Sequence, residues 1–513
     1  MIAWTMVCAA LDGSGIAKTL RFSDNKYIDA SKNRYISRLV QPALVTVSPS
    51  DGGVLGIFAA ASVGELELIN NDGYLDYLAD YAFDGRDVTV ALMNDATVLR
   101  SETYVASKMQ ERSGRIFITL RTLYDTLNTP HPFDVYAGNN SLPAGVEGVS
   151  TDIKGNSKPK IFGDVRNLSP VLVNTSKLIY QACSRTTTLI GDVRGNGSVL
   201  THDTPDYASL AAMEATAPAA GHYKCFQGYF RLGSNPVGEI TCDAYDSVIN
   251  AGDVMAAILT ERSITLDTTS KSTLNAVGAV GLWFNNAAAT SYTQDATGLT
   301  IVDSTGQGVT TWSMIETIAK STGAYIYVLN GVVYAKLLDL SGSPAWTIKP
   351  HQITRIERTA MGVGINGLPI YAVEINADQI ETTQHILDGT VVPMTDVIRY
   401  KYKTRRVTST DSATLTRHPL AKKLTFDSAL RSLTDAQSAA DRLLAIVKNR
   451  TDRVSLDMQY ADNGDYSGVP TVNIGDMVTV KSDLLGYTSG RNMAIIGYTL
   501  DIKKNKITLE LFG

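Results

Sequence analysis

Cysteine is scarce in this chain of 513 residues, which contains only Cys8, Cys183, Cys225 and Cys242. Four cysteines are too few to cross-link a chain of this length, and their spacings contain no CxxC pair, so a disulfide scaffold is excluded. Two interpretations stay open. The four thiolates come from distant segments and could converge on an iron–sulfur or other metal site, or they are small buried residues that meet only by chance.

The chain also lacks a surplus of basic residues and a long apolar run. Its 46 Lys and Arg against 51 Asp and Glu give a net charge of −5, which provides no excess of cations to grip nucleic-acid phosphates. No segment reaches the roughly 18 apolar residues of a membrane-spanning helix, and the apolar start MIAWTMVCAAL lacks the basic region of a signal peptide. We therefore expect no membrane-spanning segment and a chain kept in a cytoplasm-like solvent.

Histidine is rare as well, and none of the six stands in a catalytic motif. A Cys–His–Asp hydrolase is conceivable where a polar loop and the strand after it bring candidate groups together. No Gly-rich elbow and no helix start presents the cysteine as a nucleophile, so we favour a structural role and predict no catalytic residue and no enzyme. The groups considered are His202, Asp203, Tyr207, His222, Cys225 and Asp243.

Two ligand-binding motifs are matched in letters only. Residues 362–367 (GVGING) satisfy GxGxxG, but a strand is expected at residues 368–375, where a dinucleotide site needs a helix, so we predict a glycine-rich turn. Residues 462–465 (DNGD) lack the alternate acids and the distant Glu of an EF-hand loop, so a β-turn is favoured over a calcium site. Apart from the open question of the four cysteines, we predict neither a cofactor nor a metal-binding residue.

The stretch around which the N-terminal part is organised is residues 64–93. Its two ends, residues 65–68 and 87–92, alternate polar and apolar residues, which predicts two half-buried strands. Residues typical of turns follow the first predicted strand and precede the second. Between the turns, helix-like spacing predicts that four side chains plug the open end of the β-layer: Tyr74, Leu75, Leu78 and Tyr81.

Further strands surround this stretch. Residues 2–11, 19–22, 40–48 and 115–121 also read as strands, and the set suffices for a β-barrel or sandwich of roughly six to eight strands. A region rich in Pro, Gly, Asn and Ser follows, which indicates a long loop or linker. Strands are expected again from residue 161 and over residues 171–180.

The middle of the chain predicts a helix followed by a hairpin. Residues 311–320 are helical in pattern, with Ser313 and Glu316 at the spacing of a capping box. Residues 324–337 alternate on either side of an Asn-Gly dipeptide, which favours a type I′ turn. The hairpin tyrosines could stack sugars or bases, but we favour packing, because strands are rich in Tyr for that reason alone: Tyr325, Tyr327 and Tyr334.

Residues 400–425 are locally basic. This segment either lines a pore or meets an acidic partner, or it is a solvated extended arm whose charges protect an edge strand from wrong pairing. Its cations are Lys401, Lys403, Arg405, Arg406, Arg417, Lys422 and Lys423.

The C-terminal part predicts a helix over residues 433–450, capped at Thr434 with Gln437 completing the box. Its apolar face consists of Ala440, Leu443, Leu444 and Val447. We expect this helix to lie on a small barrel made of strands at residues 453–460, 477–481, 493–501 and 506–511.

A family resemblance is carried by three sequence segments (below, sequence phrases), which occur in this order: residues 65–92 (ELELINNDGYLDYLADYAFDGRDVTVAL), 158–181 (KPKIFGDVRNLSPVLVNTSKLIYQ) and 230–243 (FRLGSNPVGEITCD). The chain resembles the tail-tip or baseplate hub proteins of long-tailed bacteriophages and prophages, over roughly residues 20 to 265 and more loosely beyond. The resemblance implies a mainly β fold with α+β modules and several barrel or sandwich domains. It also implies a homotrimer in which two tube-like domains per chain form a pseudo-sixfold ring.

On this basis we expect a structural virion protein that joins the tail tube to the tip and lines or closes the channel for DNA delivery. Its implied partners are distal tail or tail-tube ring proteins, the tape measure protein and central tip or fibre proteins, with transient passage of phage DNA. Assembly is expected in the bacterial cytoplasm. The alternative is a tail-tip protein that recognises the host by binding a carbohydrate or receptor, which predicts a solvent-facing aromatic cluster.

The size of the chain and these patterns together predict several domains. They are an N-terminal β-barrel (1–128), a linker or long loop (129–160), a second β-rich domain (161–265), an α+β module with helix and hairpin (266–345), a β-rich connecting domain with the basic arm (346–430) and a C-terminal helix with a small β-barrel (431–513).

Overall fold

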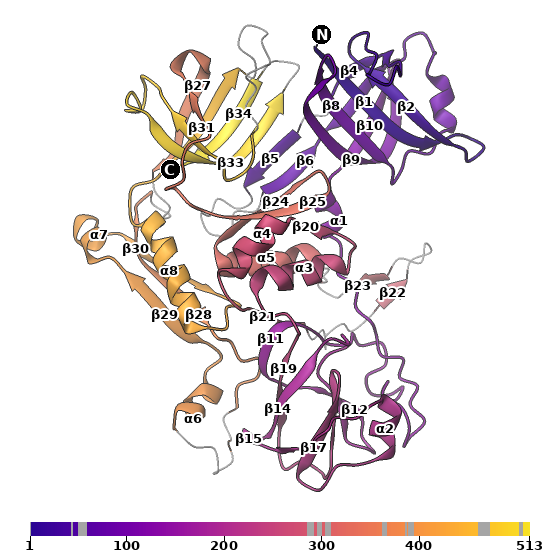
Figure 1. Ribbon diagram of the computed structural model, residues 1–513, viewed down its shortest axis with the longest axis vertical. Helices are drawn as coiled ribbons and strands as arrows, with labels where there is room; N and C mark the ends of the chain where they lie inside the picture. Colours follow the sequence, from indigo (N-terminus) through magenta and orange to yellow (C-terminus); the bar gives the residue numbers. More distant parts are fainter. Residues whose placement is uncertain are drawn as a thin grey trace.

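The computed structural model describes residues 2–42, 45–49, 59–284, 292–294, 300–302, 309–361, 367–384, 387, 394–459, 472–501 and 506–513. The fold is mainly β, as the alternating patterns predict, with one nearly closed barrel, one half-barrel and several smaller sheets. Figure 1 shows two β-units at the top of the molecule, a helical layer below them and a third β-region at the bottom. None of the helices in the described part of the chain is long and apolar enough to cross a membrane.

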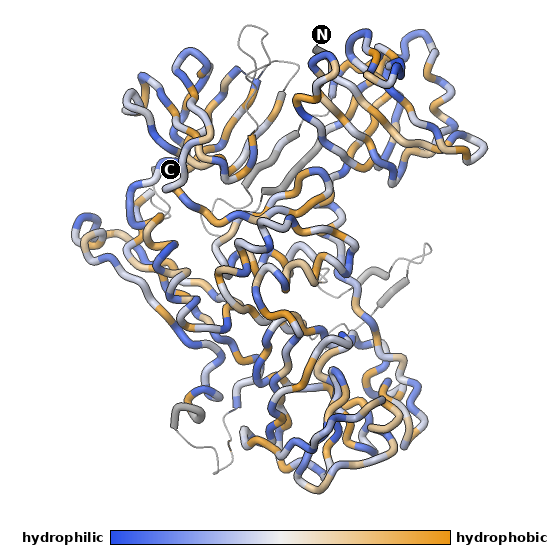
Figure 2. The backbone as a smooth tube through the Cα atoms, in the orientation of Figure 1, coloured by the Kyte–Doolittle hydropathy of each residue, from blue (hydrophilic) through white to orange (hydrophobic). Residues whose placement is uncertain are grey.

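The N-terminal barrel is a sheet of eight strands in the order β3-β2-β1-β8-β9-β10-β7-β4, and β4 lies close enough to β1 nearly to close it. Figure 2 shows hydrophobic and hydrophilic residues alternating along the strands of both upper β-units, which is the pattern of a sheet with one buried face. The strands are β1 (Ile2–Leu11), β2 (Ala17–Ser23), β3 (Ile36–Ser37), β4 (Leu39–Gln41), β7 (Glu65–Ile69), β8 (Asp87–Asn94), β9 (Thr97–Arg112) and β10 (Arg115–Arg121).

The plug predicted inside this barrel is confirmed in part. A short 3₁₀ helix (η2, Asp76–Asp80) connects β7 to β8, and Leu75 and Leu78 are fully buried. Tyr74 was predicted among the buried residues, but it is 58 % exposed because it precedes the helix and lies against Arg38 at the surface.

The single strand predicted over residues 40–48 is wrong. Pro42, which has no N–H to donate to a ladder, follows β4 and ends that strand. The next strand, β5 (Val45–Pro49), pairs with β6 (Ala59–Val63) and leaves the barrel for another sheet.

The C-terminal half-barrel has the strand order β26-β32-β33-β34-β31-β27, and β5 joins it alongside β33. All four strands predicted at the end of the chain are confirmed, with ends that differ by at most two residues from the expected ones. Its strands are β26 (Trp346–Ile348), β27 (Ile353–Met361), β31 (Asp452–Gln459), β32 (Met477–Val480), β33 (Arg491–Asp501) and β34 (Lys506–Phe512), and a 3₁₀ turn, η3 (Pro350–Gln352), precedes β27.

The layer below the two β-units combines helices with a small sheet. The predicted hairpin is confirmed: β24 (Ala324–Leu329) pairs with β25 (Val332–Leu337), and both turn residues have positive φ. The predicted cap of the helix that precedes this hairpin in the chain is wrong. The Thr310 hydroxyl accepts the Ser313 N–H, and Ser313 lies inside the helix. The other elements are α1 (Leu123–Leu127), α3 (Ala251–Thr260), β20 (Thr265–Leu266), α4 (Thr268–Asn275) and α5 (Thr311–Thr322).

The β-region at the bottom consists of two five-stranded sheets. The strand predicted over residues 171–180 is instead a hairpin, because Asn174 begins a turn by accepting the Lys177 N–H. One sheet contains β11 (Lys160–Leu168), β14 (Leu189–Gly195), β15 (Ser198–Val199), β19 (Ile240–Tyr245) and β21 (Gly281–Phe284). The other contains β12 (Val171–Asn174), β13 (Ile179–Gln181), β16 (Thr201–His202), β17 (His222–Phe226) and β18 (Tyr229–Leu232), with α2 (Leu210–Ala215) beside it, and a separate pair is formed by β22 (Tyr292–Gln294) and β23 (Thr300–Val302).

The last module is a three-stranded sheet in the order β29-β28-β30. Helix α8 (Leu433–Val447) packs on β28 and β29 (Figure 1), not on the barrel strands as predicted. Its predicted apolar face is buried. Ser432, not Thr434, caps it by accepting the Asp435 N–H. The remaining elements are β28 (Ile370–Ala377), α6 (Met394–Lys401), β29 (Arg405–Thr410), α7 (Ser412–Arg417) and β30 (Lys422–Asp427).

Candidate functional site at the junction of the two β-units

The two upper β-units are joined by strand addition. The β5–β6 hairpin leaves the N-terminal barrel and pairs antiparallel with β33 of the half-barrel, with Thr46 opposite Thr499. The hydroxyl of Thr499 donates to that of Thr46 over 3.3 Å. Because backbone hydrogen bonds of a sheet edge fix both register and orientation, this hairpin sets how the two units lie relative to each other.

A buried charged group faces the same junction. Arg100, Glu102 and Tyr104 occupy alternate positions of β9 and so share one face of the sheet. Glu102 is only 7 % exposed, and its Oε1 accepts a 2.6 Å hydrogen bond from the Arg100 Nε while the Tyr104 hydroxyl donates to Oε2. Burial, and then the Glu102 charge, raises the pKa of Tyr104, which keeps this hydroxyl protonated as a donor. The Arg100 guanidinium also lies over the ring of Tyr498 in β33, 5.6 Å from its centroid.

A cavity of about 290 Å³ lies beside this group, where the barrel, the α1 helix, the β24–β25 turn and β33 meet. The turn is held against the barrel because the Thr103 N–H donates to the Asn330 Oδ1 over 3.3 Å. No thiol or imidazole is present among the described residues that line the cavity, so the lining holds no thiol–imidazole pair. The arrangement is that of a joint at which three modules meet.

This joint was not predicted from the sequence. Arg100 and Tyr498 are far apart in the chain, and each lies in a strand of ordinary pattern. The one local signal was the pair Arg100 and Glu102, two charges that point to the same face of a strand.

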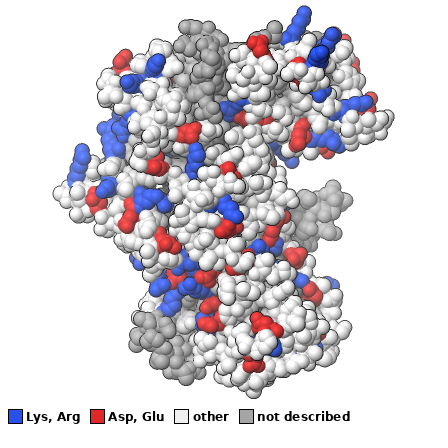
Figure 3. Space-filling model, viewed as in Figure 1, with Lys and Arg blue, Asp and Glu red and all other residues white. Residues whose placement is uncertain are grey.

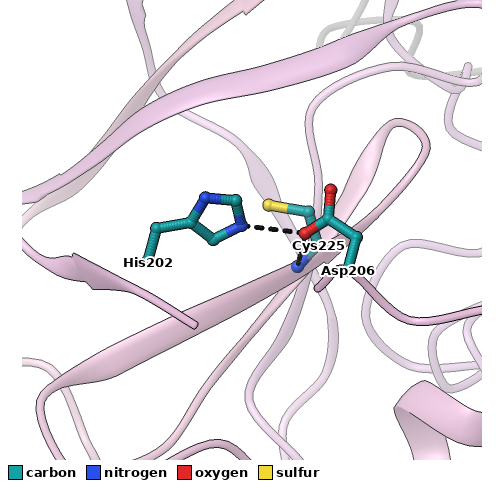
Figure 4. A group of neighbouring side chains, drawn as sticks. All are labelled: His202, Asp206 and Cys225. Atoms are coloured by element: carbon teal, nitrogen blue, oxygen red, sulfur yellow. Dashed lines mark hydrogen bonds and ion pairs between the residues drawn. The ribbon is translucent and has the colours of Figure 1, made fainter. Parts of the chain in front are cut away.

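The six residues considered for a hydrolase form separate groups. Asp203 binds the His222 Nδ1 at 2.6 Å. His202 instead meets Asp206, which was not among the six, and Cys225 (Figure 4). Elsewhere, Asp243 accepts hydrogen bonds from the Arg194 Nη2 at 2.6 Å and the Asn167 N–H at 2.8 Å, and the Tyr207 hydroxyl donates to the Thr216 carbonyl at 2.6 Å.

The thiol of Cys225 is poorly suited to act as a nucleophile. It is 3 % exposed, and burial, together with the negative charge of Asp206, raises its pKa. A nucleophilic cysteine needs a lowered pKa so that thiolate is present. The burial of the thiol and its raised pKa therefore disfavour the hydrolase interpretation.

The four cysteines do not share one site. Cys8 is buried in the N-terminal barrel, whereas Cys183, Cys225 and Cys242 lie in the core of the lower β-region. The Cys183 sulfur is occupied by hydrogen bonds from the Ile161 and Arg185 N–H groups and the Thr188 hydroxyl. A four-thiolate iron–sulfur site, one of the two interpretations left open by the sequence, is therefore wrong.

The basic segment is not an isolated arm. Strands β29 and β30 flank β28, whose Glu374 pairs with Arg406 at 3.1 Å and Lys423 at 2.8 Å. The fully buried Asp378 accepts a 2.8 Å hydrogen bond from the Arg405 Nε. Figure 3 shows acidic and basic residues interspersed over this face of the molecule. Three of the seven cations are thus paired with acids of the same sheet or its end.

The hairpin tyrosines pack, as predicted. Tyr325 and Tyr327 are buried, and the rings of Tyr327 and Tyr334 stack with centroids 5.2 Å apart. Two other predicted features lie outside the described residues: the turn at residues 462–465, and the glycine-rich turn at residues 362–367 apart from Gly367.

No family model and no curated protein matches the chain. Among solved structures, it is similar to the tail protein from Neisseria meningitidis MC58, at 10 % identity and a TM-score of 0.41, over 99 % of this chain and 96 % of that one. It is similar to the 43 kDa tail protein of prophage MuSo2 from Shewanella oneidensis, at 10 % identity and a TM-score of 0.40, over 99 % and 98 % of the two chains. A chain from the virion of a native gene transfer agent particle is similar at 13 % identity and a TM-score of 0.42, over 70 % and 85 %.

Proposed function

We propose that this chain is a structural virion protein, the hub at the tail tip or baseplate of a long-tailed bacteriophage, which joins the tail tube to the tip and lines or closes the channel for DNA. The observation that carries the proposal is the pair of β-units held side by side by the β5–β6 hairpin. Three copies, each contributing two such units, would present about six units around one axis. The chain would thereby match a sixfold tube with a threefold tip.

The three sequence phrases that resemble hub proteins support the same proposal, because they form sheet in both the upper and the lower β-regions. The first spans β7 and β8 of the barrel. The second forms β11, β12 and β13, and the third runs from β18 to β19. The resemblance therefore falls on the parts of the chain that set its shape.

The half-barrel supplies edges through which copies could associate. Among the described strands, β26 and β27 end the sheet, so each leaves one row of backbone groups unpaired within it. Strand β27 carries Arg355 and Glu357, charges that discourage pairing with an unrelated edge. We infer that association is homotrimeric and that the ring meets tail-tube or distal tail proteins, the tape measure protein and a central tip or fibre protein during assembly in the bacterial cytoplasm.

The test is the mass and symmetry of the purified full chain. Light scattering should give about three times 55.2 kDa, and electron micrographs should show threefold particles with six lobes around a central opening or plug. A chain that stays monomeric at high concentration, or that labels the outside of a virion away from the tail axis, contradicts the proposal.

A second candidate function, host recognition at the tail tip, is favoured by one observation. Tyr74 and Tyr77 are 58 % and 41 % exposed on the barrel surface, and the Arg38 guanidinium lies over the Tyr74 ring. Exposed aromatic rings of this kind stack on sugars. If this candidate is right, Tyr74→Ala together with Tyr77→Ala abolishes binding to host cells or glycans. Tyr402→Ala, at a tyrosine that is 64 % exposed, leaves binding unchanged.

A further inference from the structure

Three potential metal ligands converge in the lower β-region. The Nε2 of His202, a carboxylate oxygen of Asp206 and the Sγ of Cys225 all lie within 4.8 Å of one another. Figure 4 shows the imidazole, the carboxylate and the thiol directed toward one point. They come from three places: the end of β16, the loop after it, and β17, which pairs parallel with β16.

Two of the three groups are held in position by neighbours. The His202 ring stacks on the Tyr223 ring, with centroids 4.7 Å apart and planes 7° from parallel. The Asp206 Oδ1 accepts the Cys225 N–H at 3.3 Å and contacts the His202 Nε2 at 2.8 Å. Such support fixes ring and carboxylate orientation before an ion arrives.

We propose that His202, Asp206 and Cys225 form a binding site for a zinc ion. Imidazole nitrogen, carboxylate oxygen and thiolate sulfur are the three ligand types that zinc takes in proteins, at about 2.0 to 2.3 Å. Ligand atoms of a tetrahedral zinc lie roughly 3.5 Å apart, so small rotations of the two exposed side chains bring the group to that spacing. Three protein ligands leave a fourth position for water or for an atom from a partner.

The charge and the exposure of the group suit a divalent cation. A carboxylate and a thiolate together neutralise a charge of +2, so the loaded site carries no net charge. The His202 and Asp206 side chains are 34 % and 51 % exposed, which gives the ion access from solvent, while Cys225 anchors it from the core. The bound ion would fasten the loop between β16 and α2 to β17.

Binding removes a proton from two of the ligand atoms. The Sγ–H bond of Cys225 breaks, the proton goes to solvent and a metal–sulfur bond forms, with the electron pair retained by sulfur. The Nε2 proton that His202 donates to Asp206 moves through solvent to Nδ1, which frees the Nε2 lone pair for the ion. Because binding releases the thiol proton, zinc affinity should rise with pH.

The test uses the full chain, reduced with a phosphine, and titrated with Zn²⁺ against a chromophoric chelator and with Co²⁺ by absorption spectroscopy. We expect one ion per chain and a sulfur-to-cobalt charge-transfer band. His202→Ala, Asp206→Asn and Cys225→Ala should each weaken zinc binding by more than about 100-fold, and Cys225→Ala should abolish the band. Matched controls are His222→Ala, a neighbouring imidazole already paired with Asp203, and Cys242→Ala, a neighbouring thiol.

Cys225 is buried, so its replacement could unfold the region, and circular dichroism should accompany each variant. The exposed His202 and Asp206 variants keep the test decisive, because they leave the core intact. Absence of the cobalt band in the unaltered chain, or zinc affinity that survives in the His202 and Asp206 variants, overturns the proposal.

Discussion

Arg100 of the N-terminal barrel lies over the ring of Tyr498 in the C-terminal half-barrel, with its guanidinium carbon 5.6 Å from the ring centroid. The same guanidinium neutralises Glu102, which is nearly excluded from solvent. One side chain therefore serves two purposes. It compensates a buried charge within one β-unit and contacts the other unit.

Replacing Arg100 with Ala should destabilise the chain strongly. The substitution leaves the Glu102 carboxylate buried without its cation, which typically costs about 3–5 kcal/mol. Urea unfolding followed by circular dichroism measures the loss.

The control for this variant is Arg355→Ala. Arg355 and Glu357 form a pair at the same i, i+2 spacing on strand β27, but their side chains are 58 % and 55 % exposed. Loss of such a surface pair costs less than about 1 kcal/mol. Arg355 also lies 3.9 Å from Asp457, but this carboxylate keeps Lys506 at 2.9 Å in the variant. Equal effects of the two substitutions would show that burial of Glu102 does not matter.

Gly331→Ala should destabilise the β24–β25 hairpin by about 1 kcal/mol. Gly331 has φ +74°, and a Cβ added there would meet nothing within 4 Å, so the expected cost comes from the backbone alone. Gly342→Ala is the control, since Gly342 lacks a positive φ and its Cβ would meet only Met477 at 3.4 Å. Thermal unfolding of the two variants should separate, with Gly331→Ala melting lower.

Local features of this fold could be predicted from the sequence, and their partners could not. The hairpin at Asn330 and Gly331 was predictable because two adjacent residues specify the turn. The residues of β5 were predicted to form a strand, but the pairing of β5 with β33 could not be predicted. Alternation of polar and apolar residues indicates which face of a strand is buried and does not indicate which strand lies beside it.

The helix cap of α8 and the two side-chain groups described above also depend on features that the local sequence does not specify. Ser432 and Thr434 are both capping residues by type, and only the backbone decides which of them accepts the N–H. The contact between Arg100 and Tyr498 joins opposite ends of the chain, and the grouping of Cys225 with His202 depends on the pairing of β16 with β17. The pair Arg100 and Glu102 is a local signal of the buried charge, but the partner of each site lies far away in the sequence.

Glu261 should make the chain more stable at neutral pH than in acid. Burial alone would raise its pKa, but hydrogen bonds from His131 and Lys160 and the charge of Lys160 outweigh burial and lower the pKa from 4.5 to about 2. A lowered pKa means that the unfolded chain binds more protons, so this stabilisation is complete above pH 4.5 and is lost as the pH falls toward 2. The pH dependence of urea unfolding should therefore flatten in this window in Glu261→Gln.

A carboxyl with the opposite shift provides the control. Burial raises the pKa of Glu381, so the folded chain takes up its proton first, and this group adds stability as the pH falls toward 4.5. Glu381→Gln should therefore remove a gain in stability that develops as the pH falls to 4.5, above the window in which Glu261→Gln acts. Changes of the same sign in both variants would contradict the assigned shifts.

Removing the β5–β6 hairpin should accelerate hydrogen exchange in one segment of β33 and leave exchange in the rest of the strand unchanged. If residues 43–63 are replaced by a short Gly/Ser linker, the backbone amides of Tyr498, Thr499 and Leu500 that face β5 lose their partners. Their hydrogen exchange should accelerate, because a protected amide exchanges only after its hydrogen bond opens. The first residues of β33, Arg491 to Ala494, pair with β32 and serve as an internal control within the same strand. Uniform acceleration along β33 would mean that the hairpin supports the whole half-barrel, and no acceleration would mean that it does not join the two β-units in solution.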